Sequence, residues 1–142
     1  MAKSASKKSS NKENFSLKLL GNKINKPSKI LETFPNADKG RRYLVELSTE
    51  EFTCLCPITG QPDFAKITIR YIPADKIVES KSLKFYLWSF RNEGGFHEHI
   101  VNVILNDLVA AMKPVWCEVE GVFNARGGIA IKVNAQQGKK EL

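Results

Sequence analysis

Cys56 and Asp63 are the residues of this chain whose types and spacing point most directly to chemistry. They lie seven positions apart, and the segment 57–62 between them contains two prolines and one glycine. Because prolines and glycines favour turns, this segment is expected to fold the chain back on itself. The spacing therefore predicts a loop that brings the Asp63 carboxylate to the Cys56 thiol.

The chemistry of such a pair follows from its titration. An ordinary thiol has a pKa of about 8.5, so a nucleophilic cysteine needs help from its surroundings at neutral pH. If Asp63 is desolvated beside Cys56, the two groups titrate together, and one available state is a thiolate with a neutral carboxylic acid. That state suits the addition of sulfur to a polarised carbon–heteroatom multiple bond. The structural alternative is a small buried cysteine beside a turn that Asp63 caps.

The other cysteines do not predict a disulfide framework. The chain has three cysteines, and an odd number in an otherwise cytosolic composition argues against paired bridges. Cys54 and Cys56 form a C-x-C spacing, which is not the C-x-x-C of a zinc or redox site. In an extended segment they share a face, so Cys54 is a neighbour or a redox partner of Cys56. Cys117 is distant in sequence.

The composition predicts one soluble domain with a basic tail. At 142 residues with no run of about 18 apolar residues, we expect a cytoplasmic protein that does not enter a membrane. Residues 1–30 hold eight lysines and one acid, which equals the whole net charge of +7. We expect residues 1–29 to form a basic, partly disordered tail and arm, and residues 30–142 to form a single catalytic domain.

Periodicity predicts four strands and two helices. Alternating apolar residues indicate strands over 43–47, 64–72, 115–119 and 129–133, with a hairpin loop at 124–128. Apolar residues at helical spacing indicate helices over 81–91 and from about 96 to 113, the first with Ser80 or Ser82 as its amino-terminal cap. The order is strand, strand, helix, helix, strand, strand, which predicts an α+β fold.

This order predicts an oligomer. Two helices cover only one face of a four-stranded antiparallel sheet. The other face and the two sheet edges still need partners, and copies of the subunit satisfy the edges by joining their sheets into a closed barrel.

Four segments together carry a resemblance to a known enzyme family. They are Leu55-Cys56-Pro57 with Thr59-Gly60-Gln61-Pro62-Asp63-Phe64, then Glu79-Ser80-Lys81-Ser82-Leu83-Lys84, then Phe96-His97-Glu98, and last Arg126-Gly127-Gly128. In this order they resemble the short, single-module NADPH-dependent 7-cyano-7-deazaguanine reductases, the nitrile reductases of queuosine biosynthesis, a tRNA-modification pathway. The likeness covers roughly residues 42–133. It implies a tunnelling fold, pentameric barrels that stack face to face, and sites at subunit boundaries.

The resemblance also implies roles for individual residues. Cys56 would add to the nitrile carbon to form a covalent thioimide, and Asp63 would protonate the nitrile nitrogen. Two hydrides from two NADPH molecules would then give the amine, with neither a metal nor a nucleic acid required. The residues that match the substrate-binding positions are Val78, Glu79, Ser80, His97 and Glu98. Those that match the NADPH contacts are Ser80, Lys81, Arg126 and Gly127.

These assignments make physical sense. A deazaguanine presents N–H donors that a carboxylate accepts in pairs, and a helix start favours the charge of Glu98. The start of the helix near Lys81 and an arginine on a glycine hairpin both suit phosphate, and the chain has no Rossmann G-x-G-x-x-G motif. The structural alternatives are a helix cap for Glu79 and a helix-start charge for Glu98.

One departure and two competing functions remain open from the sequence. Relatives can carry a cysteine near the position of Ile100 that pairs with the catalytic thiol, so here any such protection of Cys56 falls to Cys54 or is absent. The same fold serves zinc-dependent GTP cyclohydrolases, which would use Cys56, His97 or His99, and Cys117. A non-catalytic RNA-binding module would use the basic tail and surface aromatic residues such as Trp88 and Trp116.

Overall fold

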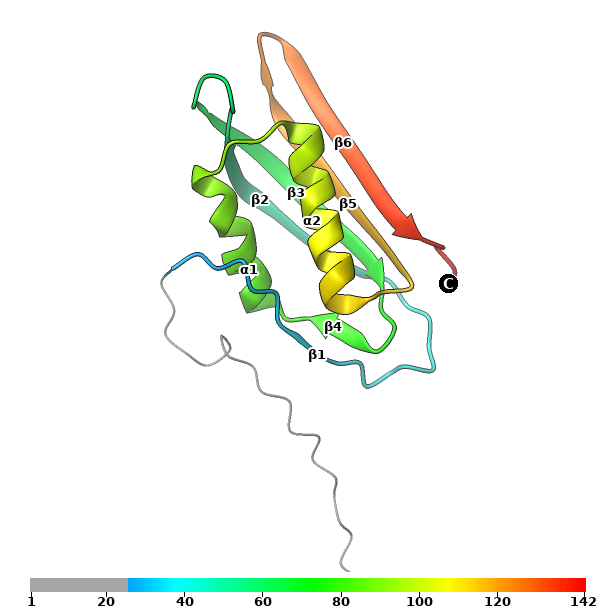
Figure 1. The fold of residues 1–142 in the computed structure, drawn as a ribbon. Helices are drawn as coiled ribbons and strands as arrows, with labels where there is room; N and C mark the ends of the chain where they lie inside the picture. Colours follow the sequence, from blue (N-terminus) through cyan, green and yellow to red (C-terminus); the bar gives the residue numbers. More distant parts are fainter. Residues whose placement is uncertain (1–25) are drawn as a thin grey trace, which may run out of the picture.

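The computed structural model describes residues 26–142, so most of the tail and arm expected over residues 1–29 lies outside the described residues. The described chain runs through six strands, two α-helices and one 3-10 helix (Figure 1). They are β1 (Thr33–Pro35), β2 (Val45–Leu55), β3 (Pro62–Ile72), β4 (Lys76–Val78), α1 (Ser80–Trp88), η1 (Ser89–Asn92), α2 (His97–Met112), β5 (Trp116–Arg126) and β6 (Ile129–Gly138).

The main sheet is antiparallel and has the strand order β2-β3-β5-β6. Helices α1 and α2 lie over the same face of this sheet, and the strand–helix order confirms the α+β class predicted from the sequence (Figure 1). The inward-facing side chains of the two central strands alternate with outward-facing ones, because side chains of a strand point to opposite faces in turn. The core therefore lies between the sheet and the helices.

The apolar stripe of α2 packs on the central strands. Val101, Ile104 and Leu108 are all fully buried, as a period of three to four residues on one helix face predicts. Gly121 on β5 lies directly beneath α2, since a Cβ atom there would stand 2.8 Å from the Val101 Cγ2. The absence of a side chain at Gly121 thus lets the helix approach the sheet.

Two local predictions differ from the structure. Strands β1 and β4 form a separate two-stranded sheet, which the sequence did not predict because three-residue strands are too short to show alternation. The amino-terminal cap of α1 is Glu79, rather than Ser80 or Ser82. The helix predicted over 81–91 ends its α-helical part at Trp88 and continues as a 3-10 helix.

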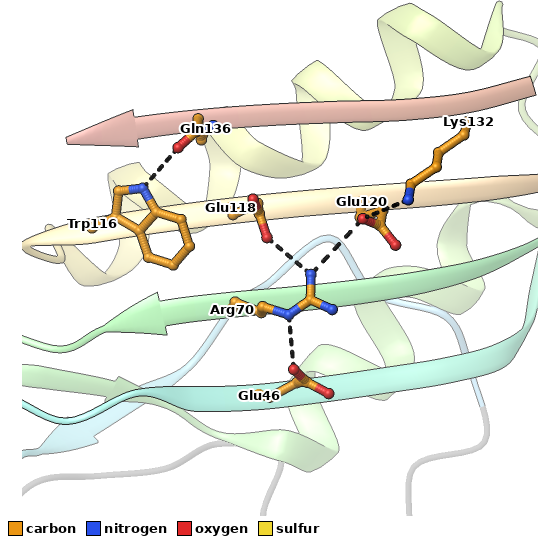
Figure 2. Close-up of polar contacts among 7 residues, drawn as sticks. All are labelled: Glu46, Arg70, Trp116, Glu118, Glu120, Lys132 and Gln136. Carbon is orange, nitrogen blue, oxygen red and sulfur yellow. Dashed lines mark hydrogen bonds and ion pairs between the residues drawn. The ribbon is translucent and has the colours of Figure 1, made fainter. Parts of the chain in front are cut away.

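The face of the sheet opposite the helices carries a network of charges rather than an apolar surface (Figure 2). Arg70 on β3 stands at its centre, 2.8 Å from Glu46 and 2.9 Å from Glu118. Glu120 in turn contacts Lys132 at 3.4 Å. Such a face is stable in water without a covering layer, because antiparallel sheets tolerate one solvated face.

Within residues 26–142, the two outer strands of the main sheet each have one side without a partner strand. Strands β2 and β6 each have a neighbour on one side only. Beside β2, a largely apolar groove of about 890 Å³ runs between this strand and α1, with Leu47, Leu83 and Trp88 among its lining residues. Trp116 is buried, so it does not form the exposed stacking platform that an RNA-binding module needs, whereas Trp88 is partly exposed in the wall of this groove. Neither α-helix of residues 26–142 has the length and apolarity to cross a bilayer.

We expect Gly121→Val to destabilise the fold, because its side chain would overlap Val101 and Phe123. Overpacking of this kind costs about 1–3 kcal/mol, which urea denaturation would measure. Val122→Thr, on the exposed neighbour that faces away from the helices, is the matched control and should stay within about 0.5 kcal/mol of the parent. Equal stability of both variants would contradict the close approach of α2 to β5.

Candidate active site

Three segments meet at one end of the main sheet (Figure 1). They are the β2–β3 loop with Cys56, the first turn of α2 with His97, and the end of β5 with Arg126, just before the β5–β6 hairpin. The strand order explains this meeting, since β3 pairs with both β2 and β5. The β2–β3 loop and the β5–β6 hairpin therefore lie at the same end.

The β2–β3 loop is a tight turn, as its prolines and glycine predicted. The Cys56 N–H donates to the Gln61 carbonyl at 2.8 Å, and the Gly60 N–H donates to the Cys56 carbonyl at 2.9 Å. Gly60 has a φ of 70°, a left-handed conformation that glycine adopts without strain. The Gln61 N–H donates to Thr59 Oγ1 at 3.3 Å. These bonds hold Cys56 at the start of a closed loop, where its side chain is partly exposed.

This loop lowers the pKa of the Cys56 thiol to about 7. The largest cause is a hydrogen bond from the Thr59 side chain, followed by the backbone N–H groups of Thr59 and Ile58, and Arg126 adds a smaller contribution. Hydrogen bonds to the charged form favour that form, so a large share of Cys56 is thiolate at neutral pH.

The other two thiols have the opposite environment. Burial raises the pKa of Cys54 to about 11, with a further contribution from the charge of Asp63. Burial raises the pKa of Cys117 to about 12. All three cysteines are free thiols, but only Cys56 combines exposure with a lowered pKa. Cys56 is therefore the nucleophile candidate among the three.

Asp63 lies at the same end but is almost fully buried. In the β2–β3 register it stands directly opposite Cys54, and Cys54 is two residues from Cys56 in the sequence. Only 5% of the Asp63 side chain is exposed. Its Oδ1 is 3.0 Å from Arg126 Nη1, and its Oδ2 is 3.2 Å from His97 Nε2. A buried carboxylate needs such partners. Both oxygens of Asp63 are thus engaged by side chains from other elements.

His97 and Arg126 are themselves held in place. The imidazole of His97 stacks on Phe123, with ring centroids 3.9 Å apart and an angle of 6° between the planes. Arg126 Nη2 donates to Gln61 Oε1 at 2.9 Å, so its guanidinium bridges Asp63 and the Cys56 loop. The sequence analysis singled out neither Phe123 nor the roles of Thr59 and Gln61. The position of Thr59 in the turn was a usable signal for a hydroxyl near Cys56, whereas no local signal linked Phe123 to His97.

Four of the remaining predicted residues lie at the opposite end of the subunit. Val78, Glu79, Ser80 and Lys81 are at the start of α1, next to the small β1–β4 sheet (Figure 1). The nine residues of α1 and the four of η1 separate them from the Cys56 end. At 1.5 and 2.0 Å per residue, this distance is roughly 20 Å. Within one subunit, the structure does not bring the two groups of site residues together.

Glu79 has a structural role at that end. Its carboxylate accepts the backbone N–H groups of Lys81 and Ser82, both at 2.8 Å. These two N–H groups are therefore not available to a phosphate, which corrects the expectation of a fully open helix start. Glu79 is buried, while Ser80 beside it is exposed.

The last two predicted residues are accessible at the Cys56 end. Glu98 lies in the first turn of α2, next to His97, and its side chain is exposed. Gly127 follows Arg126 in the β5–β6 turn with a φ of 57°, and no atom lies within 4 Å of the place of a Cβ there. The turn beside Arg126 is thus open to an approaching ligand.

One subunit does not bring together the residues that the zinc alternative would use. Cys117 lies near the start of β5, opposite Tyr71, whereas Arg126 marks the other end of that strand. Nine residues of strand between Cys117 and Arg126 span about 30 Å. No group of three His, Cys, Asp or Glu residues in the described part of the chain is arranged to hold a metal ion.

We expect iodoacetamide to alkylate Cys56 selectively in the folded protein. The reaction needs the thiolate, so its rate should rise with pH through a midpoint near 7. Cys54 and Cys117 should react only on unfolding, because both are buried and their pKa values are raised. Peptide mass mapping after timed alkylation measures this, and a midpoint above 8 for Cys56 would contradict the described loop.

Comparison with known proteins gives a single family. The family described as "QueF-like protein" matches residues 62–142. The NADPH-dependent 7-cyano-7-deazaguanine reductase of Syntrophus aciditrophicus (strain SB) is 60% identical over 123 residues, 87% of each chain. That of Anaeromyxobacter sp. (strain K) is 57% identical over 114 residues, 80% of this chain and 93% of the relative.

A solved structure agrees with these relatives. The apo form of the archaeosine synthase QueF-Like superposes with a TM-score of 0.64 at 26% identity, covering 69% of this chain and 96% of that one. The tunnelling fold expected from the resemblance is thereby supported for the subunit. With a matching family over more than half of its length and a relative at 60% identity, this chain belongs to the QueF-like family of NADPH-dependent 7-cyano-7-deazaguanine reductases.

Proposed function

We propose that this chain reduces the nitrile of 7-cyano-7-deazaguanine to the primary amine of 7-aminomethyl-7-deazaguanine, with NADPH as reductant, in queuosine biosynthesis. The relatives carry this activity in their names. The observation that carries the proposal for this chain is the partly exposed Cys56 thiol, whose pKa is lowered to about 7 and whose loop is joined through Arg126 to the buried Asp63. An ionised thiol next to a proton-carrying group is what addition to a nitrile requires.

In the first step, the Cys56 sulfur attacks the nitrile carbon. A carbon–sulfur bond forms, one carbon–nitrogen π bond breaks, and its electron pair moves to nitrogen. The nitrogen then takes a proton, so the product is a neutral thioimide. The proton that Cys56 releases on ionising balances this step, and we assign its transfer to Asp63, which lies at the same end of the sheet.

For Asp63 to carry that proton, one of its oxygens must exchange a partner. Arg126 has 39% of its side chain exposed, whereas His97 has 14% and is stacked on Phe123. Arg126 is therefore the partner that moves, and His97 keeps the carboxyl group oriented.

The described residues fit a phosphorylated cofactor at this end. Arg126 is a partly exposed cation beside the open turn at Gly127, and an arginine fork matches a phosphate in two hydrogen bonds. Ser80 and Lys81, at the start of α1, are the second group expected to contact NADPH. When bound, NADPH supplies the two hydrides that take the thioimide to the amine. The chain's own residues hold the substrate, provide the thiol and deliver protons.

The residues expected to bind the substrate, and likewise those expected to bind the cofactor, are divided between the two ends of the subunit. Of the substrate residues, Glu79 lies at the start of α1 and Glu98 at the start of α2. Of the cofactor residues, Ser80 and Arg126 are divided in the same way. Because roughly 20 Å of helix separates the ends, each complete site requires two subunits.

The free edges of the sheet support that assembly. Strands β2 and β6 are open to pairing, and the apolar groove beside β2 is a place for a neighbouring subunit to pack. Four exposed apolar side chains also surround the Cys56 end, which favours a covered interface there. They are Ile58, Phe64, Phe96 and Ile129. We propose pentamers, single or stacked, in the cytoplasm, where thiols stay reduced.

We expect mixing with 7-cyano-7-deazaguanine, without NADPH, to give a covalent adduct on Cys56. Intact-protein mass spectrometry should show it in the parent and in Cys54→Ala and Cys117→Ala, and should show none in Cys56→Ala. Asp63→Asn should slow adduct formation by about 10²-fold or more, because the nitrogen loses its proton donor. An adduct that survives in Cys56→Ala would rule out the thioimide.

If sites are shared between subunits, we expect two inactive variants to regain activity when they are combined in one oligomer. Cys56→Ala and Glu79→Gln should each abolish turnover alone, and Glu79→Gln keeps an acceptor for the α1 cap. Hetero-oligomers of the two should regain activity, because some interfaces combine an intact Cys56 with an intact Glu79. The matched control pairs Cys56→Ala with Asp63→Asn, which lie at the same end and should not complement. Equal activity of both mixtures would contradict a shared site.

A further inference from the structure

A continuous path of hydrogen bonds joins the nucleophile to the acid. The Thr59 hydroxyl donates to the Cys56 sulfur, and Thr59 Oγ1 accepts the Gln61 N–H at 3.3 Å. Gln61 Oε1 accepts Arg126 Nη2 at 2.9 Å, and Arg126 Nη1 lies 3.0 Å from Asp63 Oδ1. Every member except Arg126 comes from the β2–β3 loop and the start of β3.

Arg126 reaches this path because β5 is irregular near its end. Phe123 points toward the helices, so a strict period of two would turn Arg126 to the opposite face. The β5–β6 register shifts between Phe123 and Arg126, and such a shift re-aims the side chains beyond it. Asp63 lies on the side of the sheet that faces the helices, as its burial indicates. The irregularity therefore turns Arg126 toward the acid.

We propose that Gln61 and Arg126 are positioning residues which, together with Thr59, tie the Cys56 thiolate to the Asp63 carboxylate and set the charge of the pair in the free enzyme. Arg126 is bound at two nitrogens to two different acceptors, so a point charge cannot replace it. Gln61 takes part twice, with its backbone N–H on Thr59 and its side-chain oxygen on Arg126. Loss of Gln61 Oε1 should thus release Arg126 from the Cys56 loop.

The other charged groups around the pair do not duplicate this link. Asp63 meets His97 from α2 and lies opposite Cys54 on β2. Glu93 of the segment before α2 is paired with Lys29 at 3.0 Å. Within the described residues, Arg126 is the group that contacts both Asp63 and the Cys56 loop.

The consequence for catalysis rests on the proposed function, whereas the hydrogen-bonded link between the Cys56 loop and Asp63 does not. When Arg126 turns to a cofactor phosphate, it releases Asp63 and loosens its hold on the thiolate in the same movement. The same residue then adjusts both reacting groups, and Gln61 decides how firmly it is held before the cofactor binds.

The test is the pH profile of Cys56 alkylation by iodoacetamide in the full-length protein, with neither nitrile nor NADPH present. Thr59→Val should slow the reaction at pH 7 most, by about five-fold, as a rise of one pKa unit from near 7 gives. Thr59→Ser should restore it. Arg126→Gln and Gln61→Met should each slow it about two-fold, and the double variant should be no slower than Arg126→Gln alone, because both act through one contact.

Arg126→Lys separates positioning from charge. A lysine keeps the charge but cannot hold Gln61 and Asp63 with a rigid fork, so it should behave like Arg126→Gln. Lys132→Gln on the outer face is the control. It should not change the rate of Cys56 alkylation, either alone or in combination with Gln61→Met. Gln61 is exposed, so Gln61→Met leaves the core intact.

Two results would overturn the proposal: an unchanged profile for Gln61→Met, or a Gln61→Met, Arg126→Gln double variant whose effects add. A wild-type profile for Arg126→Lys would likewise show that charge alone suffices. If the profiles change as expected but no nitrile adduct forms, the proposed function fails and the positioning role stands.

Discussion

The buried carboxylate of Asp63 is the constraint on which the site depends. A carboxylate removed from water needs partners for both oxygens, and here those partners come from β5 and α2. Arg126 and His97 meet this need only if the β2–β3 loop, the end of β5 and the start of α2 converge at one end of the sheet. The fold supplies that convergence through the pairing of β3 with both β2 and β5. The need of the buried Asp63 for two partners thereby links the sheet topology to the chemistry at Cys56.

The same topology places the expected site residues at two ends of one subunit. Helix α1 runs along the sheet, with Glu79 at one end and the segment toward Cys56 at the other. The charged outer face is solvated, and the open edges and apolar groove lie where neighbours would pack. In the pentamer that we propose, the contacts that close the sheet edges would also bring the α1 residues of one copy to the thiol of another, so assembly and catalysis would be one requirement.

Local patterns in the sequence predicted the parts that local physics determines. Prolines and Gly60 predicted the Cys56 loop, and helical spacing predicted α2. The sequence did not reveal β1 and β4, because three residues show no alternation. It favoured Ser80 or Ser82 as the cap of α1, because serine is the commoner cap, and gave the cap at Glu79 only as an alternative. The Arg126–Asp63 pair depends on a register irregularity between two strands, which no local pattern encodes. Contacts that depend on the register between distant strands could therefore not be predicted from the sequence.

The most direct test of the account is a crystal structure of the assembled protein with 7-cyano-7-deazaguanine bound and NADPH absent. The account predicts a bond between the Cys56 sulfur and the former nitrile carbon, with Asp63 of the same subunit at the nitrogen. It also predicts Glu79 of a neighbouring subunit at the edge of the base. A bound base that leaves Cys56 unmodified and contacts residues of one subunit alone would contradict it.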